Sequence, residues 1–174
     1  MLKTLTITLA LFFFVSNASA QTVEEDTKSI DAIMTAVYDV ISGPAGEQRD
    51  WDRFRSLFAP GAKLIPVVLS QGATPIAGYN SIDDYIGFVD QYFLENGFFE
   101  VEIFRKVERF GHVAHAFSTY ESRQKEDDAE PFARGINSFQ LLHDGNRWWV
   151  VNIFWNDENA AGETIPDKYL SDQK

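Results

Sequence analysis

Apolar residues recur at helical spacing in three stretches of the N-terminal half of the chain. Between Ile30 and Ile41 they lie three or four residues apart, and Gly43-Pro44 then ends the pattern. Asp50 can cap a second, short helix, and Asn80 or Ser81 can cap a third. The pattern therefore predicts three amphipathic helices, over residues 30–41, over residues 51–58 and from Ile82 to about Asn96.

After residue 97 the periodicity changes to an alternation of apolar and polar positions, which is typical of β-strands. Asp144-Gly145 is a strong hairpin turn, and a polar, acidic loop at residues 125–131 joins two of the alternating segments. Helices followed by a run of antiparallel strands predict an α+β fold with the helices on one face of a sheet. The predicted strands cover residues 64–69, 98–109, 113–124, 132–143 and 147–157.

Both ends of the chain differ from this domain. Residues 1–20 contain Lys3, an apolar run from Leu5 to Val15, and a small-residue ending, which together predict a secretory signal peptide cleaved before Gln21. The apolar run is too short to span a membrane. We therefore expect a secreted or periplasmic protein with no membrane attachment after cleavage. The expected segments are a signal peptide (1–20), a flexible N-terminus (21–28), one folded domain (29–157) and a polar C-terminal tail (158–174).

Charge and cysteine content narrow the possible functions. The 174 residues include 15 basic and 26 acidic side chains, and the loss of Lys3 with the signal peptide makes the net charge of −11 one unit more negative. Such a chain repels nucleic acid and anionic lipid. The absence of cysteine removes thiol nucleophiles and thiolate metal sites. His112 and His115 point to opposite faces of a strand, so neither a metal site nor a cofactor is expected.

The hairpin turns allow an approximate strand register. A two-residue turn at Asp144-Gly145 places Asn137 opposite Asn152, and a symmetrically closed acidic loop places Thr119 opposite Asn137. These three side chains then form a polar row, with Glu121 just beyond it and Phe117 and Phe154 among the apolar neighbours. Buried polar groups cost about 1–3 kcal/mol each when unpaired, so a row of this kind indicates a small-molecule pocket or a self-satisfied hydrogen-bond network. A register slip of one residue would instead select Ser118, Tyr120 and Arg134.

The opposite face of the predicted sheet also contains large apolar side chains. A sheet with helices on one side normally has a polar second face. Another copy of the chain is the simplest cover for an apolar second face, so the pattern predicts a homodimer that packs sheet against sheet.

Several segments resemble the nuclear transport factor 2-like (NTF2-like, or SnoaL-like) superfamily in order and spacing. They are DWDRFRSLFAPGA, FFEVEIF, FGHVAHAFSTYESR and GINSFQLLHDGNRWWVVNIFWND, and the resemblance covers most of residues 27–157. It implies a cone in which three N-terminal helices pack on a curved antiparallel sheet, with a pocket at the wide end and frequent dimers. The superfamily includes isomerases, cyclases, hydrolases, dehydratases and members with no known reaction, so the fold alone does not assign an activity.

Three functions are compatible with these features. The first is non-catalytic binding of a small apolar molecule by Thr119, Glu121, Asn137, Asn152, Phe117 and Phe154. The second is a lyase, isomerase or hydrolase with Glu121 or His115 as general base, and with Tyr120 or Asn137 stabilising an oxyanion. Neither an isomerase's aspartates nor a hydrolase's arginine-flanked aspartate pair matches this chain by motif. The third is a dimerisation module whose own side chains fill the cavity.

Overall fold

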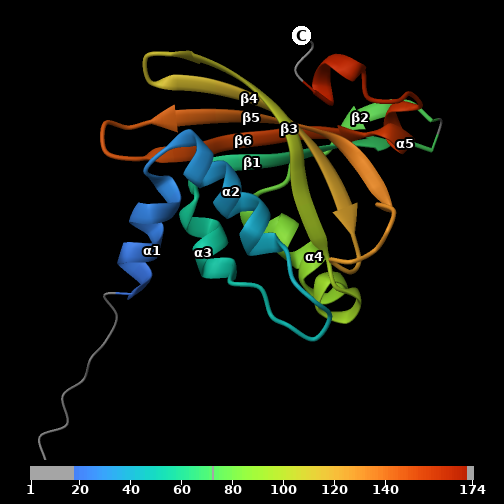
Figure 1. Ribbon diagram of the computed structural model, residues 1–174, viewed down its shortest axis with the longest axis horizontal. Helices are drawn as coiled ribbons and strands as arrows, with labels where there is room; N and C mark the ends of the chain where they lie inside the picture. Colours follow the sequence, from blue (N-terminus) through green and yellow to red (C-terminus); the bar gives the residue numbers. More distant parts are fainter. Residues whose placement is uncertain (1–17, 72, 172–174) are drawn as a thin grey trace, which may run out of the picture.

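A computed structural model describes residues 18–71 and 73–171 of the chain. The predicted signal peptide lies outside these residues, apart from its last three positions. Figure 1 shows a curved sheet with the N-terminal helices on one side of it and the C-terminal segment on the other.

The three predicted helices are present, and a fourth precedes them. Helix α1 spans Ala18–Thr27, so the segment expected to be flexible, residues 21–28, is instead mostly helical. This segment is ordered by tertiary contacts, since the Thr27 side chain is fully buried and Arg53 forms an ion pair with Asp26 at 2.7 Å. The predicted helices are α2 (Ile30–Ile41), α3 (Trp51–Ser56) and α4 (Ile82–Asn96).

Side-chain caps explain where these helices begin. Ser29 and Asp50 accept hydrogen bonds from the first-turn amides of α2 and α3. Ser81 and Asp84 form a reciprocal capping box at the start of α4. Each apolar helix face then packs against the sheet, in a core that includes Ile33, Val37, Phe54, Phe93, Phe139 and Val150.

Six strands form one sheet in the order β2-β1-β6-β5-β4-β3. Strand β1 runs parallel to β6, and the other neighbouring pairs are antiparallel. Strand β1 is longer than predicted, and the short exposed β2 was not predicted. The bounds are β1 Phe58–Leu69, β2 Pro75–Ala77, β3 Phe99–Phe110, β4 Val113–Arg123, β5 Ala133–His143 and β6 Trp148–Asp157.

The predicted strand register is wrong in two places. Asn137 lies opposite Ser118 and Trp155, not opposite Thr119 and Asn152. The hairpin after β5 is longer than two residues, because the amide of Asp144 donates to the carbonyl of Arg147. An irregularity at Val151 then shifts the pairing again. The loop between β4 and β5 also closes one position away from the symmetric arrangement.

The C-terminal tail folds back over the outer face of the sheet, away from helices α2 and α3 (Figure 1). It contains α5 (Glu158–Ala161) and a single 3₁₀ turn, η1 (Asp167–Tyr169). Ile165 is buried, and the Tyr169 ring packs edge-on against Phe117. The tail supplies part of the cover that was expected from a second copy of the chain.

Candidate functional site

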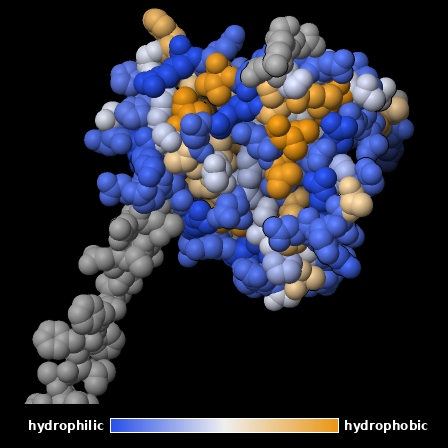
Figure 2. Space-filling view, in the orientation of Figure 1, coloured by the Kyte–Doolittle hydropathy of each residue, from blue (hydrophilic) through white to orange (hydrophobic). Residues whose placement is uncertain are grey.

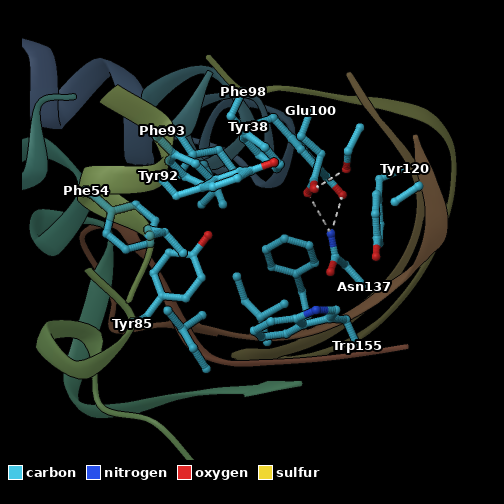
Figure 3. Close-up of a pocket in the computed structure, with 18 of the residues that line it drawn as sticks. Tyr38, Phe54, Tyr85, Tyr92, Phe93, Phe98, Glu100, Tyr120, Asn137 and Trp155 are labelled. Atoms are coloured by element: carbon cyan, nitrogen blue, oxygen red, sulfur yellow. Dashed lines mark hydrogen bonds between the residues drawn. The ribbon is translucent and has the colours of Figure 1, made fainter. Parts of the chain in front are cut away.

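A cavity of about 320 Å³ lies between the inner face of the sheet and helices α2 and α4 (Figure 3). This volume is at the small end of the range for ligand pockets, about 300–1,000 Å³. Most of the wall is aromatic or aliphatic, so the cavity suits a largely apolar ligand. The aromatic side chains that line it are Tyr38, Phe54, Tyr85, Tyr92, Phe93, Phe98, Tyr120, Phe132, Phe139 and Trp155.

The carboxylate of Glu100 lies at the polar end of this cavity. The amide Nδ2 of Asn137 donates to Oε1 at 3.3 Å, and the hydroxyl of Ser122 donates to Oε2 at 2.9 Å. Figure 3 shows Glu100 and Asn137 meeting beside the open space, with the Tyr85 hydroxyl pointing into the cavity from the opposite wall. The pocket therefore has one charged group in an apolar surround.

The turn before β3 positions Glu100. Gly97 ends α4 with a φ of 73°, and a Cβ at this position would lie 2.6 Å from the carbonyl oxygen of Gln124. The backbones of Phe98 and Gly43 exchange two hydrogen bonds, which hold the start of the strand against the end of α2. Glu100 then lies opposite Ser122 in the ladder, with its side chain on the inner face.

Burial raises the pKa of Glu100 from 4.5 to about 7, although the hydrogen bonds from Ser122 and Asn137 favour the charged form. None of the ion pairs among the described residues includes Glu100. At neutral pH this carboxyl group therefore exchanges between its two protonation states within an apolar pocket.

A hydrogen-bond chain leads from this site toward a second carboxylate. Asn137 Nδ2 also donates to the Tyr38 hydroxyl at 3.1 Å, and Tyr38 Oη lies 2.7 Å from Ser118 Oγ. Ser118 donates its proton to Glu102, so the Tyr38 hydroxyl must donate to Ser118. The three hydroxyl and amide donors of this buried row all have acceptors, and the row fixes the orientation of Asn137.

Two of the predicted site residues line this cavity. Tyr120 and Asn137 both do so, and Tyr120 belongs to the set expected after a one-residue register slip. Ser118, also in that set, supports the pocket through Tyr38. Arg134, the third member, lies opposite Glu121 on the outer face and does not enter the cavity.

The remaining predicted site residues lie on the outer face, because the register at Asn137 differs by one position from the prediction on β4 and by three positions on β6. Thr119 donates to the carbonyl of Tyr169 at 2.6 Å, and His115 Nε2 lies 2.9 Å from Ser138 Oγ. Glu121 forms ion pairs with Arg123 at 2.8 Å and Arg134 at 3.3 Å. The others on this face are Phe117, Asn152 and Phe154.

The sequence analysis did not identify Glu100, Tyr38 or Ser122 as site residues. Alternation along β3 would have paired Glu100 with Glu102 on one face, but the turn at Phe110-Gly111 left the choice of face open. The pairing of β3 with β4 is also irregular between Glu102 and Phe104. A register counted from the turn at Phe110-Gly111 would therefore put Glu100 and Glu102 opposite the wrong residues of β4. Tyr38 was visible only as part of the apolar stripe of α2.

Solved structures with the same fold have widely different sequences. An NTF2-like protein of unknown function from Silicibacter pomeroyi is 16% identical, with a TM-score of 0.52 over 75% of this chain and 93% of that one. A cystatin-like protein of unknown function from Nostoc punctiforme is 9% identical, with a TM-score of 0.55 over 74% and 87%. A proposed dehydratase of the NTF2-like family from Streptomyces avermitilis is 11% identical, with a TM-score of 0.53 over 75% and 94%.

These similarities show that the chain has the NTF2-like fold, which confirms the fold expected from the sequence. No protein-family model and no curated protein matches the sequence. At such low identities the shared fold does not assign an activity.

Within residues 18–71 and 73–171, no helix combines the length and apolar character needed to cross a membrane. In the same ranges, no cluster of three or more His, Cys, Asp or Glu side chains is arranged to hold a metal ion.

Proposed function

We propose that this protein binds a small, largely apolar molecule in the cavity between the sheet and helices α2 and α4. The observation that carries the proposal is an open, mostly aromatic space with a single carboxylate, Glu100, at one end. Apolar walls supply affinity, and a few polar groups orient the ligand. The open space counts against a cavity that the chain's own side chains fill.

We also propose that binding takes place outside the cytoplasm. The support is the sequence of residues 1–20, with Lys3, an apolar run and a small-residue ending. Detection of the mature N-terminus at Gln21 in the secreted or periplasmic fraction would test this assignment.

The test of binding uses neutral probes, 2-phenylethanol and indole, with saturation-transfer NMR on the mature protein. Val89 lines the cavity from α4, so Val89→Trp should fill the space and abolish the transfer signal. Val68 is exposed on β1, so Val68→Trp is the matched control and should leave the signal intact. Absence of binding to the wild-type protein, or equal binding to both variants, would contradict the proposal.

Acid–base catalysis at Glu100 is the second candidate function. It is favoured by a pKa of about 7, because a general base works best when its pKa lies near the working pH. A dehydratase is proposed among proteins of this fold, and elimination of water requires a base that removes a proton from carbon and an acid that protonates the leaving hydroxyl group. If catalysis occurs, Glu100→Gln should lower kcat by at least about 100-fold. Substrate binding without turnover by the wild-type protein would leave binding as the sole function.

A further inference from the structure

The charges around the cavity point to the chemical class of the ligand. We propose that the pocket selects a small organic cation, namely a protonated amine carried on an apolar body. This inference rests on the proposed binding function and adds the ligand class. Its basis is the set of charged, hydrogen-bonding and aromatic groups that face the cavity.

The first observation is that the wall contains one charged side chain and no basic one. Glu100 is the only Asp, Glu, Lys, Arg or His among the residues that line the cavity. A buried carboxylate without a cation pays a large desolvation cost, which a ligand cation in contact with it would offset. A ligand anion would instead meet like charge, with no arginine or lysine in the wall to bind it.

The other ionisable groups around Glu100 leave its charge uncompensated. Burial raises the pKa of Tyr38 from α2, Tyr85 from α4 and Tyr120 from β4, so all three stay neutral below pH 9. Glu102, the next carboxylate along β3, accepts from Ser118 and lies 3.5 Å from Arg105. The negative charge of Glu100 therefore has no cationic partner among these neighbours.

The second observation is that acceptor groups remain available beside the carboxylate. Asn137 donates from Nδ2 to Glu100 and to Tyr38, and no hydrogen bond among the described residues uses its amide oxygen, which can therefore accept. The Tyr85 hydroxyl faces the cavity from the opposite wall (Figure 3). An ammonium group has three N–H donors, and the carboxylate of Glu100 and the amide oxygen of Asn137 offer acceptors for them.

The third observation is the aromatic surface that lines the cavity. Tyr85 and Trp155 meet edge to face with ring centroids 6.4 Å apart, and Phe93 stacks on Phe98 at 4.2 Å. Faces of Trp, Tyr and Phe attract cations by about 0.5–2 kcal/mol. The overall net charge of −11 also favours the approach of cations over anions.

The test compares two probes of the same size, 2-phenylethylamine and 2-phenylethanol, by isothermal titration calorimetry of the mature protein at pH 8. We expect the protonated amine to bind at least tenfold more tightly than the alcohol. Glu100→Gln should remove this preference while keeping the binding of the alcohol, which also shows that the variant is folded. Glu121→Gln, on the outer face, is the matched control and should keep the preference.

A pH series separates this site from general attraction to an acidic protein. The preference for the amine should fall as the pH is lowered from 8 to 5.5, because Glu100 becomes protonated in this range while 2-phenylethylamine stays charged. The alcohol binding as tightly as the amine would overturn the cation inference and leave the binding proposal standing. Failure of both probes to bind would overturn both.

Discussion

Glu100 determines the main electrostatic behaviour of the pocket. Its pKa of about 7 in the folded protein lies above the ordinary value of 4.5, so between these pH values the folded state holds a proton that the unfolded state releases. The free energy of unfolding therefore falls as the pH rises from about 4.5 to about 7, and it stays lower above that range. The contribution of this group is at most about 3 kcal/mol.

We predict that Glu100→Gln removes this fall in the free energy of unfolding between about pH 4.5 and pH 7. At pH 8 the variant should be more stable than the wild-type protein, by up to about 3 kcal/mol, because a neutral amide replaces a buried charge. At pH 5 the two proteins should differ little. Urea unfolding at both pH values measures the change, with Glu121→Gln as the control. A stability difference that is equal at pH 5 and pH 8 would show that Glu100 does not titrate in this window.

The Tyr38 hydroxyl is the second critical group at the residue scale. Tyr38→Phe removes the acceptor for Asn137 and the donor to Ser118, and both partners are buried. We expect the free energy of unfolding to fall by about 1–3 kcal/mol, the usual cost of unpaired buried polar groups. Tyr92→Phe is the control, since the Tyr92 hydroxyl accepts one long, exposed hydrogen bond of 3.4 Å. Equal stability of the two variants in urea would contradict the role of the buried row.

Helix α4 and the turn after it position Glu100 at the cavity. Gly97 has a positive φ, and its hydrogen atoms face backbone atoms of both Gln124 and Ala45. We expect Gly97→Ala to lower the free energy of unfolding by at least about 1–3 kcal/mol through backbone strain and overlap.

Gly87 in the same helix is the matched control for Gly97. No atom lies within 4 Å of the position its Cβ would take, so Gly87→Ala should stabilise α4 by about 0.5–1 kcal/mol. Thermal unfolding of the two variants should therefore show shifts of opposite sign. Shifts of the same sign would mean that the turn at Gly97 does not constrain the fold.

At the scale of elements, local patterns predicted the helices and strands well. The apolar stripe from Ile30 to Ile41 and the cap at Ser81 each predicted a helix that the structure contains. Alternation predicted four long strands with small errors at their ends. The bulge at Val151 and the asymmetric loop before β5 depend on tertiary packing, so counting residues could not reveal them.

The predicted polar row does not form, because the register between the strands differs from the prediction. Thr119 and Asn137 were placed on one face, and the structure puts Thr119 on the outer face under Tyr169. Because neighbouring strand residues point to opposite sides, an error of one position exchanged the cavity with the outer face. Asn137 lines the cavity, although its expected cross-strand partners were wrong.

The whole molecule presents a largely hydrophilic surface in the view of Figure 2, with separate apolar patches. On the outer face of the sheet, beyond the C-terminal segment, Val113 and Leu142 pair across β4 and β5 and are 57% and 37% exposed. We propose that two copies of the chain pack through this uncovered part of the outer face, the homodimer expected from the sequence.

Negative charges introduced on this face by substitution should dissociate such a dimer. We expect sedimentation velocity to give twice the mass of the mature chain for the wild-type protein, and a single mass for Val113→Glu combined with Leu142→Glu. Phe88→Glu is the control, since Phe88 is 72% exposed on α4, and it should leave the dimer intact. A wild-type protein that sediments as a monomer would contradict this assembly.

A crystal structure of the mature protein grown with 2-phenylethylamine tests the central claim, that the cavity beside Glu100 is a ligand site. We predict density for the ring within the cavity, against the aromatic wall that includes Tyr85 and Trp155, with the nitrogen atom about 3 Å from the carboxylate of Glu100. An empty cavity, with the amine bound only at the surface, would contradict the account.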